Sequence, residues 1–118
     1  RIFAENRKKE EQIDSRTATI WKVKKYLAVH YSEKLKLQDI ADQFHLSVKY
    51  FCKIFKEETG ETFVSYLTEL RLKEAEKLLK TTELKTYEIA ERTGFSDYHH
   101  FCKTFKKVTG KTPSDIRD

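Results

Sequence analysis

Apolar positions recur along most of the chain with the 3.6-residue period of amphipathic helices. In residues 17–30, for example, Ile20, Val23 and Leu27 fall on one helical face. With three glycines and one proline in 118 residues, the chain has too few breakers for a fold of many strands. We therefore expect an all-α protein of about seven helices. They are predicted at residues 17–30, 37–44, 48–59, 63–80, 87–93 and 97–109, with a short last helix from 113.

One amphipathic sequence occurs twice. FCKIFKEETGET at residues 51–62 returns as FCKTFKKVTGKT at residues 101–112, and eight of the twelve positions are identical. The match extends into the preceding turns, where ADQFHLS at 41–47 corresponds to AERTGFS at 90–96. The repeat predicts two similar structural units within one chain.

The turn before each repeated helix has the spacing of a helix-turn-helix. An alanine lies four residues before a turn position that His45 or Gly94 occupies, and a serine, Ser47 or Ser96, follows two residues later as the expected N-cap. The small alanine lets the two helices approach, and the turn position favours a residue that tolerates positive φ. An ordinary helical hairpin with a glycine cap is the alternative, but two copies in register favour the helix-turn-helix.

The end of each repeat predicts a helix terminus and a new start. Gly60 and Gly110 suit the left-handed position that closes a helix. Thr62 is expected to cap the long helix that follows the first repeat. Thr112 is expected to cap the last helix, with Pro113 at its first position.

The pattern divides the chain into four segments. Residues 1–16 contain nine charged residues and are expected to be a linker or a solvent-facing helix. The first helix-turn-helix subdomain is expected at 17–62, a linker helix at 63–80, and the second helix-turn-helix subdomain at 81–118. The linker helix contains neither glycine nor proline, which predicts a rigid spacer. The chain has no methionine and begins with Arg1, which suggests that an upstream domain is missing.

Each helix after a turn has an apolar face and a basic face. The residues expected in the core are Val48, Phe51, Ile54 and Phe55 in the first copy, and Phe101, Phe105 and Val108 in the second. The exposed faces carry Lys49, Cys52, Lys53 and Lys56 in the first copy, and His99, Cys102, Lys103 and Lys106 in the second, with no acidic residue on either. A DNA major groove admits a helix, and lysine amines can reach guanine acceptors or phosphates there.

Composition is compatible with a polyanionic partner. The formal net charge is +5 and the isoelectric point is near 9.1. The sequence contains neither a run of 18 apolar residues nor a secretory signal, so we expect a cytoplasmic location without a membrane span.

The two cysteines occupy equivalent positions, Cys52 and Cys102. In a cytoplasmic protein we expect two reduced thiols rather than a disulfide. A zinc site built from His99, His100 and Cys102 is the alternative, but adjacent histidines point to different sides of a helix and no CxxC motif occurs. Neither thiol has a nearby nucleophile signature, and no phosphate-binding glycine loop is present. We therefore expect no catalysis, no metal and no cofactor.

With these motifs the chain resembles the DNA-binding domain of AraC/XylS-type bacterial transcription regulators. The similarity covers about residues 18–117. It is carried by LQDIADQFHLS at 37–47 and above all by IAERTGFSDYHHFCKTFKKVTGKTPSDIR at 89–117. The resemblance implies two subdomains, each of which places its second helix in a major groove of double-stranded DNA.

The resemblance also implies roles for individual residues. The implied base-reading residues are Lys49, Cys52, Lys53, Tyr98, His99, Cys102 and Lys103. Those expected to contact phosphates are Tyr50, Lys56, Thr62, His100, Lys106, Lys107 and Thr112. The chain departs from the common family pattern in carrying cysteines in place of small polar residues at two of these positions. It also has lysine at 53 and 103, where arginine is frequent, and lysine lacks the bidentate fork with which arginine recognises guanine.

The function expected from the sequence is specific binding of double-stranded DNA as the output domain of a transcription regulator, an activator that works with RNA polymerase and an upstream sensor or receiver domain. A helical protein-interaction module whose lysines bind an acidic protein surface is the competing class. A third class is an enzyme, such as an alkyl acceptor that uses one thiol. The sequence lacks the metal ligands or partner residues that would activate a cysteine for such a reaction.

Overall fold

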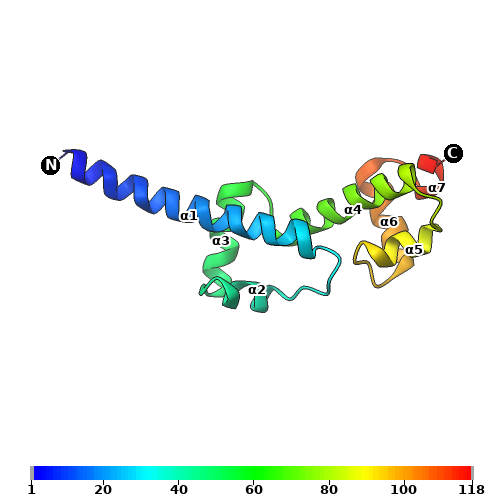
Figure 1. Cartoon of the computed structure of the whole chain (residues 1–118), viewed down its shortest axis with the longest axis horizontal. Coiled ribbons are helices and arrows are strands. Elements are labelled where there is room, and N and C mark those ends of the chain that lie inside the picture. Colours follow the sequence, from blue (N-terminus) through cyan, green and yellow to red (C-terminus); the bar gives the residue numbers. More distant parts are fainter. Residues whose placement is uncertain (1, 118) are drawn as a thin grey trace. The chain divides into compact units, whose positions relative to one another are not determined.

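The computed structural model describes the backbone of residues 2–117 and the side chains of residues 15–117. Within residues 2–117 the chain forms seven helices and no strand, so the all-α prediction is confirmed (Figure 1). The helices are α1 (Ile2–His30), α2 (Leu37–Gln43), α3 (Val48–Thr59), α4 (Phe63–Thr81), α5 (Thr86–Arg92), α6 (Tyr98–Thr109) and α7 (Pro113–Arg117). None of them has both the length and the hydropathy that a membrane span requires.

Helix α1 is longer than the periodic pattern predicts. It runs without a break from Ile2 to His30, so residues 2–16 form a helix that continues directly into 17–30. Of the two expectations for the charged segment, a linker or a helix, the helical one describes its backbone.

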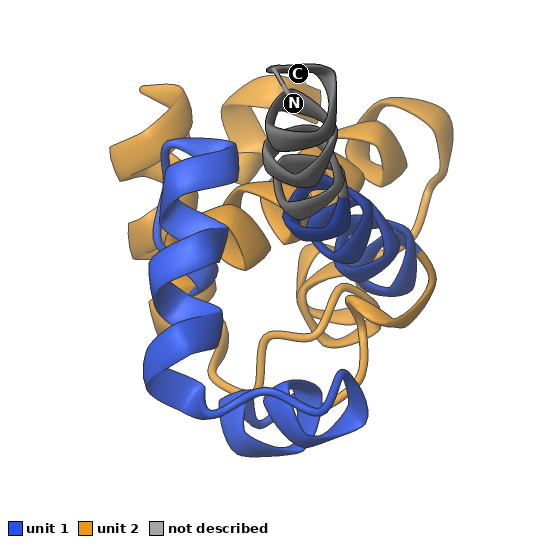
Figure 2. Cartoon of the chain, turned by 90° about the vertical axis from the view of Figure 1, so that its left-hand side faces the viewer, with its two compact units in different colours: residues 1–28, 35–63 blue, residues 29–34, 64–118 orange. Residues whose placement is uncertain are grey.

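The chain forms two compact units (Figure 2). Unit 1 comprises residues 1–28 and 35–63, and unit 2 comprises residues 29–34 and 64–118. The loop after α1 therefore belongs to unit 2, although the chain returns to unit 1 immediately afterwards. Each unit contains one of the two repeats.

Three aromatic rings form the centre of unit 1. Phe51, Phe55 and Phe63 are buried, and each pair of ring centroids is 5.7 Å apart. Such edge-to-face and tilted arrangements add to the free energy gained from removing the rings from water. The other buried apolar residues of this unit are Ile20, Val23, Leu27, Ile40, Ala41 and Ile54. The predicted core face of α3 is thus confirmed, with Val48 partly buried at its start.

Unit 2 repeats this arrangement. Phe101 and Phe105 of α6 are fully buried, and their centroids are again 5.7 Å apart. They join a core that also contains Leu72, Ala75, Leu79, Ile89, Ala90 and Phe95. The prediction for Val108 is wrong, because this side chain is 50% exposed. It lies in the last turn of α6, one turn beyond Phe105, and the equivalent residue of α3, Glu58, is exposed too.

Both helix-turn-helix turns have the predicted backbone. His45 has φ 59° and Gly94 has φ 100°, so both occupy the left-handed region. The N-cap prediction holds in one copy. The Ser47 hydroxyl accepts a hydrogen bond from the backbone N–H of Tyr50. In the second copy the cap is Asp97 and not Ser96, because one extra residue follows the serine before α6 begins.

Arg71 of α4 fastens the loop after α1 within unit 2. Its Nε donates to the Tyr31 carbonyl at 2.7 Å, and its Nη2 donates to the Glu33 carbonyl at 2.9 Å. Partial burial lowers the pKa of Arg71 below its ordinary value. Gly94 lies directly against this contact, since a Cβ built on it would be 2.7 Å from Arg71 Nε and 2.8 Å from the Tyr31 carbonyl oxygen.

Arg117 closes the other end of unit 2. Its guanidinium donates to the carbonyls of Leu79 at 3.3 Å and Thr82 at 3.0 Å, and also to that of Leu84. These three carbonyls lie at the C-terminal end of α4 and in the following loop. One side chain thus holds α7 to the segment between α4 and α5.

We expect Arg117→Ala to lower the free energy of unfolding by about 2 kcal/mol, because hydrogen bonds from a charged donor contribute about 1.5–3 kcal/mol. Arg117→Lys should recover part of the loss, since one ammonium cannot reach all three carbonyls. Urea denaturation followed by circular dichroism measures both. Ser114→Ala, at an exposed position of the same helix, is the control. If the Arg117→Ala variant were as stable as this control, the three hydrogen bonds of Arg117 would not contribute to stability.

Candidate nucleic-acid interface

The helices α3 and α6 have the same local construction. Each has 12 residues and ends at a glycine in the left-handed conformation, with φ 80° at Gly60 and 82° at Gly110. In each last turn a threonine hydroxyl donates to the carbonyl four residues back, at 2.8 Å for Thr59 and 2.7 Å for Thr109. The core phenylalanines fix the rotation of each helix, so the equivalent lysines on the other face are exposed in both units.

The exposed face of α3 is basic. Lys49, Cys52, Lys53 and Lys56 are all exposed, as the sequence predicts. Ser47, Lys49, Tyr50 and Lys53 line a shallow hollow of about 410 Å³ at the start of the helix. Among residues 15–117, no carboxylate lies within 4.0 Å of these three ammonium groups. Their charge is therefore free to attract a polyanion.

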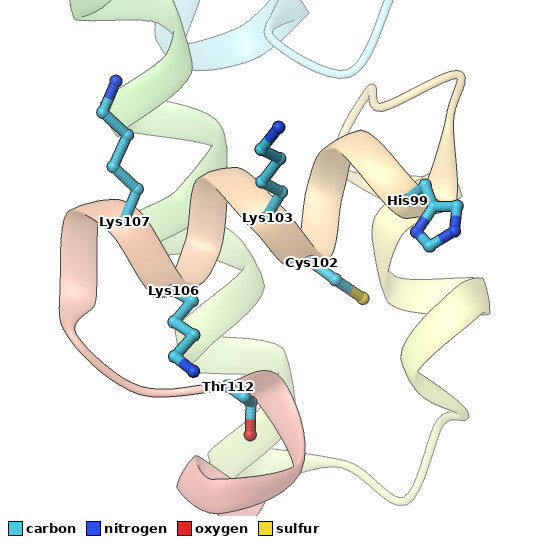
Figure 3. Close-up of a pocket in the computed structure, with 6 residues that line it drawn as sticks. All are labelled: His99, Cys102, Lys103, Lys106, Lys107 and Thr112. Carbon is cyan, nitrogen blue, oxygen red and sulfur yellow. The ribbon is translucent and has the colours of Figure 1, made fainter.

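The exposed face of α6 has a larger hollow of about 560 Å³ (Figure 3). It is lined by His99, Cys102, Lys103, Lys106, Lys107 and Thr112. Figure 3 shows Lys103 and Lys107 projecting to one side of α6, whereas Lys106 points toward Thr112. In the part of the chain with described side chains, no ion pair involves the three lysines. The structure thus brings together five of the residues that the sequence placed on this surface, with Thr112 at its edge.

Thr112 is held in place by a reciprocal cap. Its hydroxyl accepts from the backbone N–H of Asp115, and its own backbone N–H donates to the Asp115 carboxylate, both at 3.1 Å. The hydrogen bond from this N–H lowers the pKa of Asp115 below its ordinary value, with the Thr112 hydroxyl as a further cause. The predicted cap is confirmed, and it orients Thr112 at the rim of the hollow.

The side chains at the start of α6 make different contacts. Asp97 accepts from the backbone N–H groups of His99 and His100, which fixes the first turn. His100 is exposed, and its ring lies 6.1 Å from that of Phe95. Tyr98 bonds to Thr86 through its hydroxyl at 2.8 Å.

Tyr98 lies in a different hollow from the other predicted base readers of α6. This hollow is lined by Tyr87, Ala90, Glu91, Phe95, Ser96 and Tyr98. Tyr87 is 53% exposed there, and the sequence pattern does not predict its place on this surface. Its position at the polar start of α5, outside the repeated phrase, gave no signal of a surface role.

The two thiols are free and differ in environment. Cys52 is exposed, whereas Cys102 is partly buried and packs against the core of unit 2. Within the part of the chain that the structure describes, no three His, Cys, Asp or Glu side chains are grouped to hold a metal ion.

Comparison with known proteins gives a consistent picture. A family model described as a helix-turn-helix domain matches residues 40–118. The Msm operon regulatory protein of Streptococcus mutans is 37% identical over 108 residues, which are 92% of this chain and 39% of that protein. The transcriptional activator RhaS of Escherichia coli is 38% identical over 92 residues, covering 78% of this chain and 33% of that protein. The chain therefore spans about two fifths or less of the length of these relatives.

A solved structure shares the fold closely. The C-terminal domain of AraT, a response regulator from Geobacillus stearothermophilus, superposes with a TM-score of 0.81 at 35% sequence identity. The match covers 84% of this chain and 83% of that domain.

Proposed function

Because the chain belongs to the AraC/XylS-type family of DNA-binding helix-turn-helix transcription regulators, we propose that α3 and α6 enter two successive major grooves of one operator. The observation that supports this mode is the pair of basic helix faces, each on the second helix of its helix-turn-helix. A helix in that position is the element that such motifs place in the groove.

Base contacts are assigned to residues in the first two turns of α3 and α6. In unit 1 these are Lys49, Cys52 and Lys53, and in unit 2 they are His99, Cys102 and Lys103. Tyr98 remains a candidate at the edge, because its hydroxyl is already bonded to Thr86. Lysine acts as a mobile point charge toward guanine N7 and O6, so discrimination here depends on several modest contacts.

Phosphate contacts are assigned to residues beside these base-reading positions and toward the end of each helix. The proposed residues are Tyr50, Lys56 and Thr62 beside α3, and His100, Lys106, Lys107 and Thr112 beside α6. Such contacts set the register and supply affinity without sequence information. Unit 2 should bind random DNA more strongly than unit 1, since α6 has Lys107 where α3 has Glu57.

The role of the whole protein is proposed from its relatives. We propose an output domain that activates transcription through RNA polymerase, with a sensor or receiver domain in the same chain. RhaS, named as a transcriptional activator, supports the activating role. AraT supports the receiver alternative, because it is a response regulator.

A protein partner with an acidic surface is the second candidate, and the unpaired lysines support it equally. Competition separates the two functions. Operator binding should persist in an excess of polyglutamate of equal charge, because that polymer offers no groove. If polyglutamate displaced the operator from the protein, the acidic protein partner would be favoured.

We expect the double substitution Lys106→Gln and Lys107→Gln to weaken binding to operator DNA and to random DNA by about the same factor. If both residues bind phosphates, the slope of log K against log salt should become less negative by about 1.8. Fluorescence anisotropy over a salt series measures both quantities. The control is Lys73→Gln with Lys77→Gln, an equal change of charge at exposed positions of α4. A loss confined to operator DNA would show that Lys106 and Lys107 read bases.

A further inference from the structure

The exposed faces of α3 and α6 share three residues at equivalent positions. The helices are related by a shift of 50 residues, which brings Cys52 onto Cys102, Lys53 onto Lys103 and Lys56 onto Lys106. Because length, C-cap geometry and last-turn hydrogen bonds agree, the backbones that present these side chains are equivalent.

The rotation of the two helices also agrees. Phe51 and Phe55 in α3 correspond to Phe101 and Phe105 in α6, and both pairs are fully buried with centroids 5.7 Å apart. Residues at fixed helical offsets from these anchors must therefore point in the same direction from each unit. The thiol and the two ammonium groups therefore have the same angular positions around both helices, although Cys52 is exposed and Cys102 is partly buried.

Among the base contacts proposed for both units, one equivalent pair differs. Val48 and Tyr98, and Glu57 and Lys107, also differ but lie outside this shared set. Lys49 in α3 corresponds to His99 in α6, and both are exposed at the first turn. A lysine offers donors alone, whereas a neutral imidazole has one donor and one acceptor. The two residues therefore favour different base edges.

We propose that the two units read the same short base element, and that the two copies in the operator differ at the base that faces Lys49 or His99. This inference rests on the proposed entry of α3 and α6 into major grooves. Within the element, a guanine is expected to face Lys53 and Lys103, because its N7 and O6 are the acceptors that lysine reaches. The operator of one chain is thus an imperfect repeat, although the protein has no two-fold symmetry of its own.

The first test is selection from random double-stranded DNA with the whole chain. We expect two patches that share an element and differ at one defined position. Two unrelated patches would overturn the inference and leave the proposed function standing. A single patch would overturn the inference as well as the two-groove mode. Recovery of no preferred sequence would reject specific recognition itself, and the inference with it.

The second test exchanges the differing residue. The His99→Lys variant should select an operator whose two copies have become identical, and its affinity for that site should exceed its affinity for the original by about tenfold, as one changed base contact of about 1–3 kcal/mol implies. Lys103→Ala is the matched comparison on the same helix, and it should relax selection at the shared guanine of one patch. If His99→Lys selects the original operator unchanged, position 99 does not distinguish the copies and the inference fails. A thermal melt that matches that of the unsubstituted chain confirms that the exposed substitution leaves the fold intact.

Discussion

Substituting alanine for Gly94 should lower the free energy of unfolding by about 3 kcal/mol and abolish DNA binding by unit 2 at temperatures where the unsubstituted chain is folded. A residue with a Cβ at φ 100° is strained by about 1–3 kcal/mol. The new Cβ would also lie 2.7 Å from Arg71 Nε and 2.8 Å from the Tyr31 carbonyl oxygen. The side chain of Arg71 can move, but the Tyr31 carbonyl is backbone, so the loop would have to shift.

Gly110 provides a matched control for this substitution. Its φ is 82°, and a Cβ built on it would meet no atom within 4 Å. Gly110→Ala should therefore cost only the backbone term, about 1 kcal/mol. Urea denaturation of both variants isolates the effect of crowding. Equal losses of stability would mean that the turn yields easily and that the contact with Arg71 and Tyr31 is not a constraint.

Inserting five base pairs between the two patches of the operator should reduce affinity by about 100-fold or more, because half a helical turn places the patches on opposite faces of the duplex and the base contacts of one unit are lost. We propose that the spacing follows from α4, which occupies the residues where the sequence predicts a rigid spacer. This helix has 19 residues without glycine or proline, and it is about 28 Å long at about 1.5 Å per residue.

A ten-pair insertion serves as the comparison, because it restores the face but adds about 34 Å between the patches. It should also bind weakly, since a helix cannot lengthen. DNase footprints on the series show whether one patch or both are protected. Affinity unchanged by five added pairs would mean that the chain between the units is flexible, or that one unit alone reads bases.

The repeat is the part of the sequence that best predicted the structure. It gave the bounds of α3 without error and those of α6 within one residue, because a glycine at a fixed offset ends both helices. It also predicted a positive φ for His45 through the equivalence of this position with Gly94. Histidine alone would not have indicated it, because histidine adopts positive φ much less readily than glycine. Local signals repeated twice were sufficient for these features.

Features that depend on distant residues were beyond this reasoning. The contact of Arg71 with the Tyr31 carbonyl joins residues 40 positions apart, and nothing near either residue indicates it. The exposure of Val108 depends on where the core ends and not on helical period. The hydroxyl bond of Tyr98 to Thr86 likewise required knowing that α5 and α6 are neighbours. The roles of individual residues toward bases and phosphates stay predictions.

The assignment of residues 29–34 to unit 2 has a consequence for dissecting the protein. A gene fragment that encodes residues 64–118 would leave out residues 29–34. Arg71 would then lack the Tyr31 and Glu33 carbonyls that accept its hydrogen bonds. A fragment that ends at Phe63 would keep residues 29–34 but lose Arg71, which binds their carbonyls. The chain is therefore interleaved, and its two halves cannot be separated by a single cut even though its sequence repeats.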